Sequence, residues 1–381
     1  MTDTATLDCD VAIIGAGPVG MALALSLKDS GQRVLLIDAR APKAWAGDPR
    51  ALALAHGSYQ LLERLQAWDA GAATKINEIH VSQRGGFGRT LLSAADYGTA
   101  ALGYVMRYSD LAGALAKQIA PDQMIFNCVV DTIETTSAQA LLTLTGTTQR
   151  ITAQLIVHAE GTPTNDPDVR VRDYHQHAII AQVTPAKPHR HRAWERFTPD
   201  GPLALLPLGD DYSVVLTVPS EQAARLLELS DDDFLSALRA RFGRRVDFVG
   251  TGARSCFPLA LRVRSPIIQQ RQVWIGNSAQ ALHPVSGQGF NLGLRDAAEL
   301  ASALLDHPSG DCAAALAAYA RGRQNDRRYS MGFTDAIVRL FSNDLAPLRC
   351  ARGIGLLALD LAPPLRHFVA KRMIWGARAW P

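Results

Sequence analysis

The 381-residue sequence predicts an α/β protein that carries an inserted antiparallel sheet and a helical C-terminal region. Three observations predict this fold class. A β-branched strand, a glycine-rich turn and an apolar helix follow one another within residues 10–38. Strands and helices then alternate to about residue 169, and residues 170–262 read as short alternating strands. After a short strand over residues 273–275, the chain reads mostly as helix.

The glycine-rich turn follows directly after the first strand, where Gly15, Gly17 and Gly20 complete Gly-x-Gly-x-x-Gly. Gly15 permits the tight turn, Gly17 lets backbone N–H groups approach a pyrophosphate, and Gly20 lets helix and strand pack closely. A second strand over residues 34–37 ends at Asp38, whose carboxylate can accept hydrogen bonds from ribose hydroxyls. The pattern predicts a Rossmann-like dinucleotide site and leaves NAD, NADP and FAD open.

The following elements are predicted from periodicity and turn residues. In the first half of the chain we expect a helix over residues 50–66, strands within 76–104 with a turn at 85–88, a helix from Ser109, and strands over 124–130 and 151–159. The inserted strands are expected at residues 178–183, 194–197, 203–208 and 213–218. Their alternation is typical of an antiparallel sheet.

Composition excludes several function classes. The net charge is only +3 and the basic residues are scattered, so no nucleic-acid partner is expected. The N-terminus lacks a signal-peptide core, and no apolar run is long enough to span a bilayer. Five widely spaced cysteines suggest a reduced, cytoplasmic protein. The pairs His175/His177 and His189/His191 have no cysteine nearby, and no metal site is predicted from them.

The second chemical motif lies at residues 276–296, where a strand, a glycine-rich loop and a helix start follow one another. Together with the first motif, it resembles the FAD-dependent aromatic hydroxylases of the para-hydroxybenzoate hydroxylase type. The Gly-Asn-x-Ala-Gln form and the run Gly287–Asp296 are similar to the ubiquinone-biosynthesis branch, and within it to the 2-polyprenyl-6-methoxyphenol hydroxylases. Residues 195–207 and 341–355 resemble that branch as well.

This resemblance implies a set of FAD contacts. A helix that begins near Gln288 would aim its N–H groups at the flavin edge, which turns negative on reduction. Gly287 and Gly289 would let the backbone lie against the ring. Asn277, where the family usually has Asp, can still hydrogen-bond a ribityl hydroxyl. The expected cofactor-binding residues are Gly15, Gly17, Gly20, Asp38, Arg50, Arg107, Glu160, Gly161, Asn277, Pro284, Gly287, Gln288, Gly289, Phe290 and Asn291.

Some of these residues have an alternative interpretation. Arg50 and Arg107 match positions that contact FAD in relatives, but each could be a solvated surface arginine. His283 could be a structural loop histidine or a polar group near the flavin. The family's middle motif reads here as Ala159-Glu160-Gly161, and its arginine is replaced by Pro167. The electron donor therefore stays open between NAD(P)H and another reductase system, and without a second dinucleotide motif it would bind only transiently.

The reaction implied by the resemblance is a flavin monooxygenation. A flavin C4a-hydroperoxide, formed from reduced FAD and O₂, would hydroxylate the ring of an apolar polyprenyl phenol in ubiquinone biosynthesis. We expect the substrate to contact Leu203, Leu205, Pro207 and Pro284, although an ordinary core strand explains the apolar residues 203–207 equally well. The alternatives are a flavin hydroxylase or epoxidase of another apolar compound, and a non-catalytic flavin-binding subunit of a quinone-synthesis complex.

The domain prediction follows these motifs. Residues 1–72, 97–169 and 264–345 are assigned to the FAD-binding domain, 73–96 and 170–263 to the substrate-binding sheet domain, and 346–381 to a C-terminal helical segment. After Pro363-Pro364, residues 365–380 carry a basic, approximately amphipathic pattern with tryptophan. Such a helix can lie peripherally on the inner face of a membrane, directly or through a quinone-biosynthesis complex, or it can pack on the flavin domain.

Overall fold

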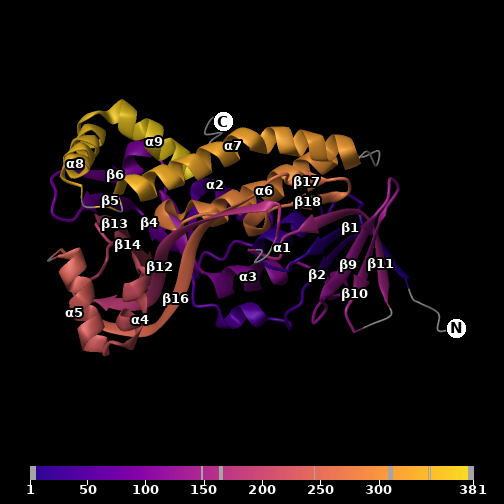
Figure 1. The fold of residues 1–381 in the computed structure, drawn as a ribbon, viewed down its shortest axis with the longest axis horizontal. Coiled ribbons are helices and arrows are strands. Elements are labelled where there is room, and N and C mark those ends of the chain that lie inside the picture. The colour runs from indigo at the N-terminus through magenta and orange to yellow at the C-terminus, as the bar shows by residue number, and fades with distance from the viewer. Residues whose placement is uncertain are drawn as a thin grey trace.

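The computed structural model describes residues 6–146, 149–162, 166–243, 245–307, 312–341, 343 and 345–375. It confirms the predicted α/β fold with an antiparallel sheet and a helical C-terminal region. Two large sheets lie side by side, a small sheet joins them, and long helices run across the top of both (Figure 1).

The first sheet has parallel strands at its centre and carries the glycine-rich turn. Its strands, in spatial order, are β17 (Ile268–Gln269), β18 (Gln272–Trp274), β11 (Arg150–His158), β1 (Thr6–Ile14), β2 (Val34–Ile37) and β8 (Met124–Ile125), with β10 (Ala140–Leu144) and β9 (Val130–Thr135) added antiparallel beside β11. The helices α1 (Pro18–Ser26), α3 (Tyr108–Ala116) and α6 (Gln288–Leu305) contribute buried apolar residues to the main core beside this sheet. The apolar runs of β1 and β11 are therefore covered, as parallel strands require.

The second sheet is antiparallel except for one pair, β13 and β5. Its order is β19 (Gln280–Ala281), β16 (Phe248–Arg264), β12 (Val169–Pro185), β15 (Asp211–Pro219), β14 (Gly201–Leu208), β13 (Arg192–Thr198), β5 (Glu78–Gln83) and β6 (Arg89–Ser93). One face packs on α4 (Ser220–Glu228) and α5 (Asp231–Phe242), which form a second core with it. The opposite face looks toward the C-terminal helices (Figure 1).

A third sheet connects the other two and corrects part of the prediction. It consists of β3 (Ala51–Ala55), β7 (Gly103–Arg107) and β4 (Thr74–Ile76). The helix α2 (His56–Arg64) follows β3 directly in the sequence. The predicted helix over 50–66 was thus wrong in its first third, because Leu52 and Leu54 alternate with alanine, and this period of two suits a strand. The strand at 74–76 was assigned to the inserted sheet but pairs with β7. The strand expected over 124–130 is divided between β8 and β9, and α3 begins at Tyr108 without a side-chain cap.

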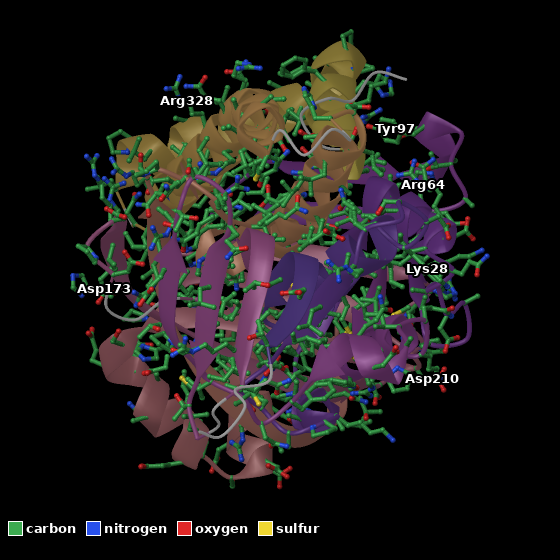
Figure 2. The ribbon with its side chains drawn as sticks, turned by 90° about the vertical axis from the view of Figure 1, so that its right-hand side faces the viewer. Lys28, Arg64, Tyr97, Asp173, Asp210 and Arg328 are labelled. Carbon is green, nitrogen blue, oxygen red and sulfur yellow. The ribbon has the colours of Figure 1, made fainter. Side chains whose placement is uncertain are left out.

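The C-terminal helices cover the second sheet. The helices are α7 (Cys312–Phe341), α8 (Ala346–Leu361) and α9 (Pro363–Trp375). The helix α8 lies very close to the β5–β6 hairpin, because a Cβ on Gly88 would be only 2.3 Å from the carbonyl oxygen of Gly353. The hydroxyl of Thr90 also donates to the carbonyl of Leu356 at 2.7 Å. Tyr97, labelled in Figure 2 beside the yellow C-terminal helices, contacts His367 of α9 edge-on.

Candidate active site

Three motifs that are far apart in the sequence meet at the N-terminus of α1. Gly15 has a φ of +106°, and a Cβ there would lie 2.5 Å from the carbonyl carbon of Ala159. A Cβ on Gly20 would lie 2.1 Å from the carbonyl oxygen of Gly15, which confirms that this glycine allows helix and strand to pack. A Cβ on Gly276 would lie 3.3 Å from Val19. The fold therefore brings residues 15–20, 159–161 and 276–278 together.

Gly17 differs from its two partners because the protein itself does not require a glycine there. Its φ is −81°, which any residue adopts, and an added Cβ would meet only the Tyr108 hydroxyl, at an ordinary 3.5 Å. It is the N-cap of α1, and no side chain caps that helix. Uncapped N–H groups and the positive end of a helix dipole suit phosphate oxygens. A dinucleotide pyrophosphate fits this position.

Asp38 lies at the end of β2 as predicted, but its carboxylate already has partners. It accepts hydrogen bonds from the backbone N–H of Ala16 at 2.8 Å and from the backbone and guanidinium of Arg40 at 2.8–2.9 Å. Burial alone would raise the pKa of Asp38, but the Arg40 hydrogen bonds outweigh it and lower that pKa. A ribose hydroxyl would have to share this carboxylate with Arg40, a residue that the sequence analysis missed.

The two predicted arginines lie at different places. Arg50 is held by Asp48 through a bidentate ion pair at 2.5 Å and stacks over the Tyr108 ring at 4.6 Å. Because the Tyr108 hydroxyl lies next to Gly17, Arg50 lies near the N-terminus of α1. Arg107 is exposed at the end of β7 and donates to the Gln182 side chain of β12 at 2.6 Å, across the boundary between the sheets.

The middle motif packs against the third one. The backbone N–H of Gly161 donates to the Ser278 hydroxyl at 3.3 Å, and that hydroxyl donates to the Gly161 carbonyl at 3.0 Å. The side chains of Glu160 and Asn277 are exposed, and the Glu160 carboxylate lies 3.5 Å from the His158 ring. Residues 163–165 of this motif lie outside the described part of the chain.

The glycine-rich loop ends where predicted, since α6 begins at Gln288 with Gly287 as its N-cap at φ +61°. No side chain caps this helix either. Gly289 has open space in front of its α-carbon, with Leu282 Cβ 3.9 Å from an added Cβ. Phe290 is partly buried against the first core. These positions leave the loop backbone accessible to a planar ring.

Asn291 was expected to contact the cofactor, but its side chain binds protein. The amide oxygen accepts from the backbone N–H of Ala55 at 2.8 Å and from the Ser58 hydroxyl at 2.7 Å. The amide nitrogen donates to the carbonyls of Gly287 and Ala53 at 2.7 and 2.9 Å. Only the backbone of Asn291 remains available for a flavin, and its side chain positions the loop against β3.

His283 behaves as a structural residue of the same loop. It is 1% exposed, and its Nδ1 accepts a hydrogen bond from the Val285 N–H at 3.1 Å. Burial lowers the pKa of His283 to about 4, so the ring is neutral at pH 7. This supports the structural interpretation of His283.

A buried ion cluster supports the loop from below. Asp296 of α6 accepts from the Gly276 N–H at 2.9 Å and from Gln280 at 2.6 Å. Arg323 of α7, which is fully buried, pairs with Asp296 at 2.7 Å and with Asp326 at 2.6 Å. The cluster fixes the end of β18 and its following turn relative to both helices.

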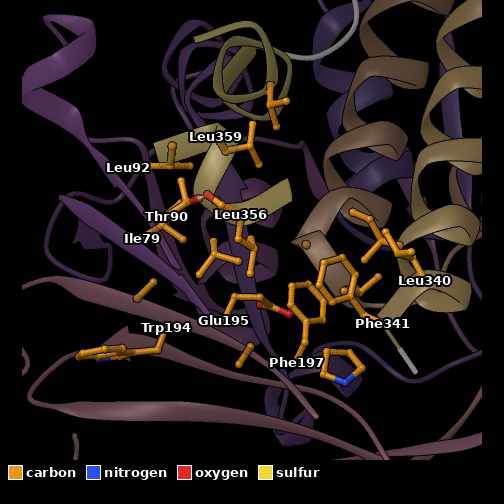
Figure 3. A pocket seen from close by; sticks show the side chains of 18 of the residues that line it. Ile79, Thr90, Leu92, Trp194, Glu195, Phe197, Leu340, Phe341, Leu356 and Leu359 are labelled. Carbon is orange, nitrogen blue, oxygen red and sulfur yellow. Dashed lines mark hydrogen bonds between the residues drawn. The ribbon is translucent and has the colours of Figure 1, made fainter. Parts of the chain in front are cut away.

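An apolar cavity of about 470 Å³ adjoins the loop (Figure 3). Pro284 and Gly287 border it on the loop side, and the second sheet forms its floor. The C-terminal helices form its roof through Phe333, Ile337, Leu340, Phe341, Leu356, Leu359 and Val369. A pocket of this kind beside a cofactor loop is the expected place for an apolar substrate.

The predicted substrate strand lines this cavity, but with its other face. Leu203 and Leu205 are fully buried in the second core against α4 and α5, and Pro207 shares their side by alternation. The cavity is lined instead by Pro202, Ala204 and Leu206. The prediction chose the wrong face because both faces of β14 are apolar. Pro284 lies at the cavity as expected.

Sequence reasoning also missed several site residues. Arg40 and Tyr108 lie beside Gly17, and Glu195 projects from the cavity floor. An arginine two residues after the strand-end acid was a readable signal for Arg40. No local signal places the helices α7–α9 over the cavity, since that contact joins segments more than a hundred residues apart.

Two negative findings apply to the described residues. None of their histidines, cysteines and carboxylates gather in groups of three that could hold a metal ion. One histidine of each pair named in the sequence analysis hydrogen-bonds to protein: His177 to the Ser220 hydroxyl, and His189 to the Gly209 carbonyl. Within the same described ranges, no helix is both long and apolar enough to cross a membrane.

Comparison with known proteins agrees with this geometry. A family described as FAD binding domain matches residues 8–328. The chain is 32% identical to ubiquinone hydroxylase UbiL of Rhodospirillum rubrum, covering 100% of this chain and 93% of that protein. It is 29% identical to 3-demethoxyubiquinol 3-hydroxylase of Escherichia coli, and the match covers 95% of this chain and 97% of that protein. The crystal structure of p-nitrophenol 4-monooxygenase PnpA from Pseudomonas putida superposes on this chain with a TM-score of 0.79, and the match covers 98% of this chain and 100% of PnpA. Because the two sequences are only 15% identical, this similarity shows a shared fold.

Proposed function

The chain belongs to the FAD binding domain family that includes the ubiquinone hydroxylases, and on this premise we propose that it is an FAD-dependent monooxygenase of ubiquinone biosynthesis. Its substrate would be a phenol that carries a polyprenyl tail, and its other substrate O₂. Bound FAD supplies the oxygen chemistry after reduction by NAD(P)H or another reductase system. We assign the pyrophosphate to Gly17 and the N-terminus of α1, and the flavin ring to the backbone of the loop from Pro284 to Gly289.

The observation that carries this proposal is the position of the apolar cavity directly beside that loop. Pro284, Val285 and Gly287 belong both to the cavity wall and to the segment that would hold the ring. A phenol in the cavity would therefore lie next to the cofactor. The mostly apolar lining disfavours water, which would protect a reactive oxygen species from side reactions.

The experiment is an oxidation assay on purified protein. We expect a yellow protein that oxidises NAD(P)H faster when 2-prenylphenol is added and converts it to a diphenol, detected by mass spectrometry. A protein that binds FAD but never turns over would support the alternative of a flavin-binding subunit. Turnover of apolar compounds without a phenol, and none of phenols, would support the other alternative.

A matched pair of variants tests the cofactor site. Gly17→Val should fold, because the added side chain meets little protein, but should lose bound FAD, because it occupies the pyrophosphate position. Gly113→Val in α3, which also points into open space, should keep stoichiometric FAD. Equal FAD content of the two folded variants would contradict the assignment of the first motif.

We further propose that α8 and α9 bring the protein to the membrane surface. Their inner face lines the cavity, whereas their outer face presents large apolar side chains. Ile354 and Leu361 of α8 are 61% and 72% exposed, and Leu365 of α9 is 46% exposed. The last part of the basic helix expected over residues 365–380, which includes Arg378 and Trp380, lies outside the described part of the chain. An apolar outer face beside a lipid-substrate cavity would favour interfacial binding.

Liposome flotation of the purified protein tests this. Truncation at Ala362 is a poor test, because Ala370 and Ile374 of α9 are buried in a core cluster with Leu92. The double variant Ile354→Glu/Leu361→Glu should instead reduce flotation with anionic vesicles. The control is Val249→Glu, a comparably exposed position on β16. Unchanged flotation of the double variant would remove α8 as an anchor.

A further inference from the structure

Glu195 places a carboxylate in the floor of the apolar cavity. It lies in a row across four strands, opposite Val81 of β5 and Ala204 of β14, with Val215 of β15 next to Ala204. All four residues line the cavity. Figure 3 shows the Glu195 side chain reaching toward the aromatic rings of the labelled Phe197 and Phe341. The carboxylate is thus surrounded by apolar groups on its own sheet and beneath the helical roof.

The Oε1 atom of Glu195 is closed off and has no hydrogen-bond partner among the described residues. The other charged residues that line the cavity have their own partners. Arg352 of α8 donates to the carbonyls of Leu340 and Phe341 at the end of α7, and Arg366 of α9 lies 3.8 Å from Asp96.

The electrostatic environment agrees with the geometry. Burial raises the pKa of Glu195 to about 7. A buried polar group without a partner is costly, and native proteins keep few of them. Such a group in a cavity is a candidate for ligand recognition.

We propose that Glu195 is a positioning residue that accepts a hydrogen bond from the phenolic hydroxyl of the substrate. This inference rests on the proposed function, because it specifies how the same cavity binds its phenol. The hydroxyl is the donor that a polyprenyl phenol offers in an otherwise apolar molecule. A fixed acceptor on the floor would hold the ring in one orientation, and thereby decide which ring carbon faces the cofactor loop at Pro284 and Gly287.

The test compares two probes: 2-prenylphenol and its methyl ether, in which a methyl group replaces the hydrogen that the phenol donates. Calorimetric titration of the FAD-loaded protein should show that the phenol binds more tightly, on the order of tenfold. Glu195→Leu should lose this preference through weaker phenol binding, while the ether binds as before. Glu195→Gln keeps the side-chain shape and should retain part of the preference. The control Glu134→Gln, at an exposed position of β9, should behave as the wild type.

The pH profile gives a second readout. Phenol binding by the wild type should weaken as the pH falls through about 7, because a protonated carboxyl is a weaker acceptor. The profile of Glu195→Gln should be flat. A phenol preference that survives in Glu195→Leu, or a wild type that binds phenol and ether equally, overturns the inference. A wild type that binds neither probe and shows no phenol-stimulated oxidation contradicts the proposed function instead.

Discussion

Arg323 is a fully buried charged residue and Glu195 a partly buried one whose Oε1 atom is closed off, and the two differ in what surrounds them. Arg323 is fully buried and pairs with Asp296, Asp326 and Glu299, so its charge is balanced on three sides. Glu195 has no such partners among the described residues. A paired buried charge holds elements together, whereas an unpaired one reduces stability unless a ligand completes it.

This difference predicts how stability depends on pH. Glu195 would ionise near 4.5 in the unfolded chain and near 7 in the folded one. The folded state therefore holds this proton more tightly, and the contribution of Glu195 to stability falls as the pH rises from 4.5 to 7, then stays low. At about 1.4 kcal/mol per pKa unit, the loss is at most about 3 kcal/mol. In urea unfolding at pH 5 and pH 8, the free energy of unfolding of Glu195→Gln should rise relative to that of Glu134→Gln as the pH increases, because only Glu134→Gln keeps the unfavourable Glu195 contribution. The same pH dependence in both variants would contradict this.

Residues whose roles depend on local geometry could be predicted from the sequence. Gly15 and Gly20 are needed for a turn and for a close approach, and both requirements lie within a few residues of chain. Asp38 was located correctly, but its partner Arg40 was missed. Glu195 could not be recognised, because its meaning depends on the helices that close the cavity above it.

At the scale of elements, strands with one polar face were easier to interpret than strands with two apolar faces. The run from Leu203 to Pro207 predicts a strand but not which side faces the ligand, since leucines occur at both odd- and even-numbered positions, which point to opposite faces. The neighbouring strands decide the register, and they turn Ala204 and Leu206 toward the cavity. The helix expected over residues 50–66 was wrong in its first third for a related reason, because Leu52 and Leu54 alternate while the later leucines follow a helical period.

The two faces of β14 should respond differently to substitution. Leu205→Ala removes a fully buried side chain of the second core and should cost about 2–5 kcal/mol of unfolding free energy, with little effect on phenol binding. Ala204→Leu adds volume inside the cavity and should weaken binding of 2-prenylphenol with a smaller effect on stability. Chemical unfolding and calorimetric titration of both variants measure this. The reverse pattern would show that the faces are assigned wrongly.

For the whole molecule, the parallel sheet and the insertion of the antiparallel sheet were predictable from the order of motifs. The first strand, the middle strand and the return strand each end in a recognisable turn, and the structure pairs them in the order β18–β11–β1–β2, which the sequence analysis did not predict. The position of the C-terminal helices was not predictable, because no sequence pattern states which distant surface a helix covers. The cavity therefore became visible only in the assembled protein.

The helix α7 has a consequence for how the molecule unfolds. Its 30 residues, Cys312–Phe341, extend about 45 Å and run along both large sheets (Figure 1). Tyr319 near its start packs in the core of the first sheet, and Phe341 at its end stacks on Phe197 of the second. A continuous helix shared by two sheets transmits the loss of either to the other, so we expect one cooperative heat-absorption peak in scanning calorimetry. Gly332→Pro should interrupt the helix at an exposed position and split that peak in two, whereas Gly332→Ala should leave it single. Two peaks in the wild type would mean that the sheets melt independently.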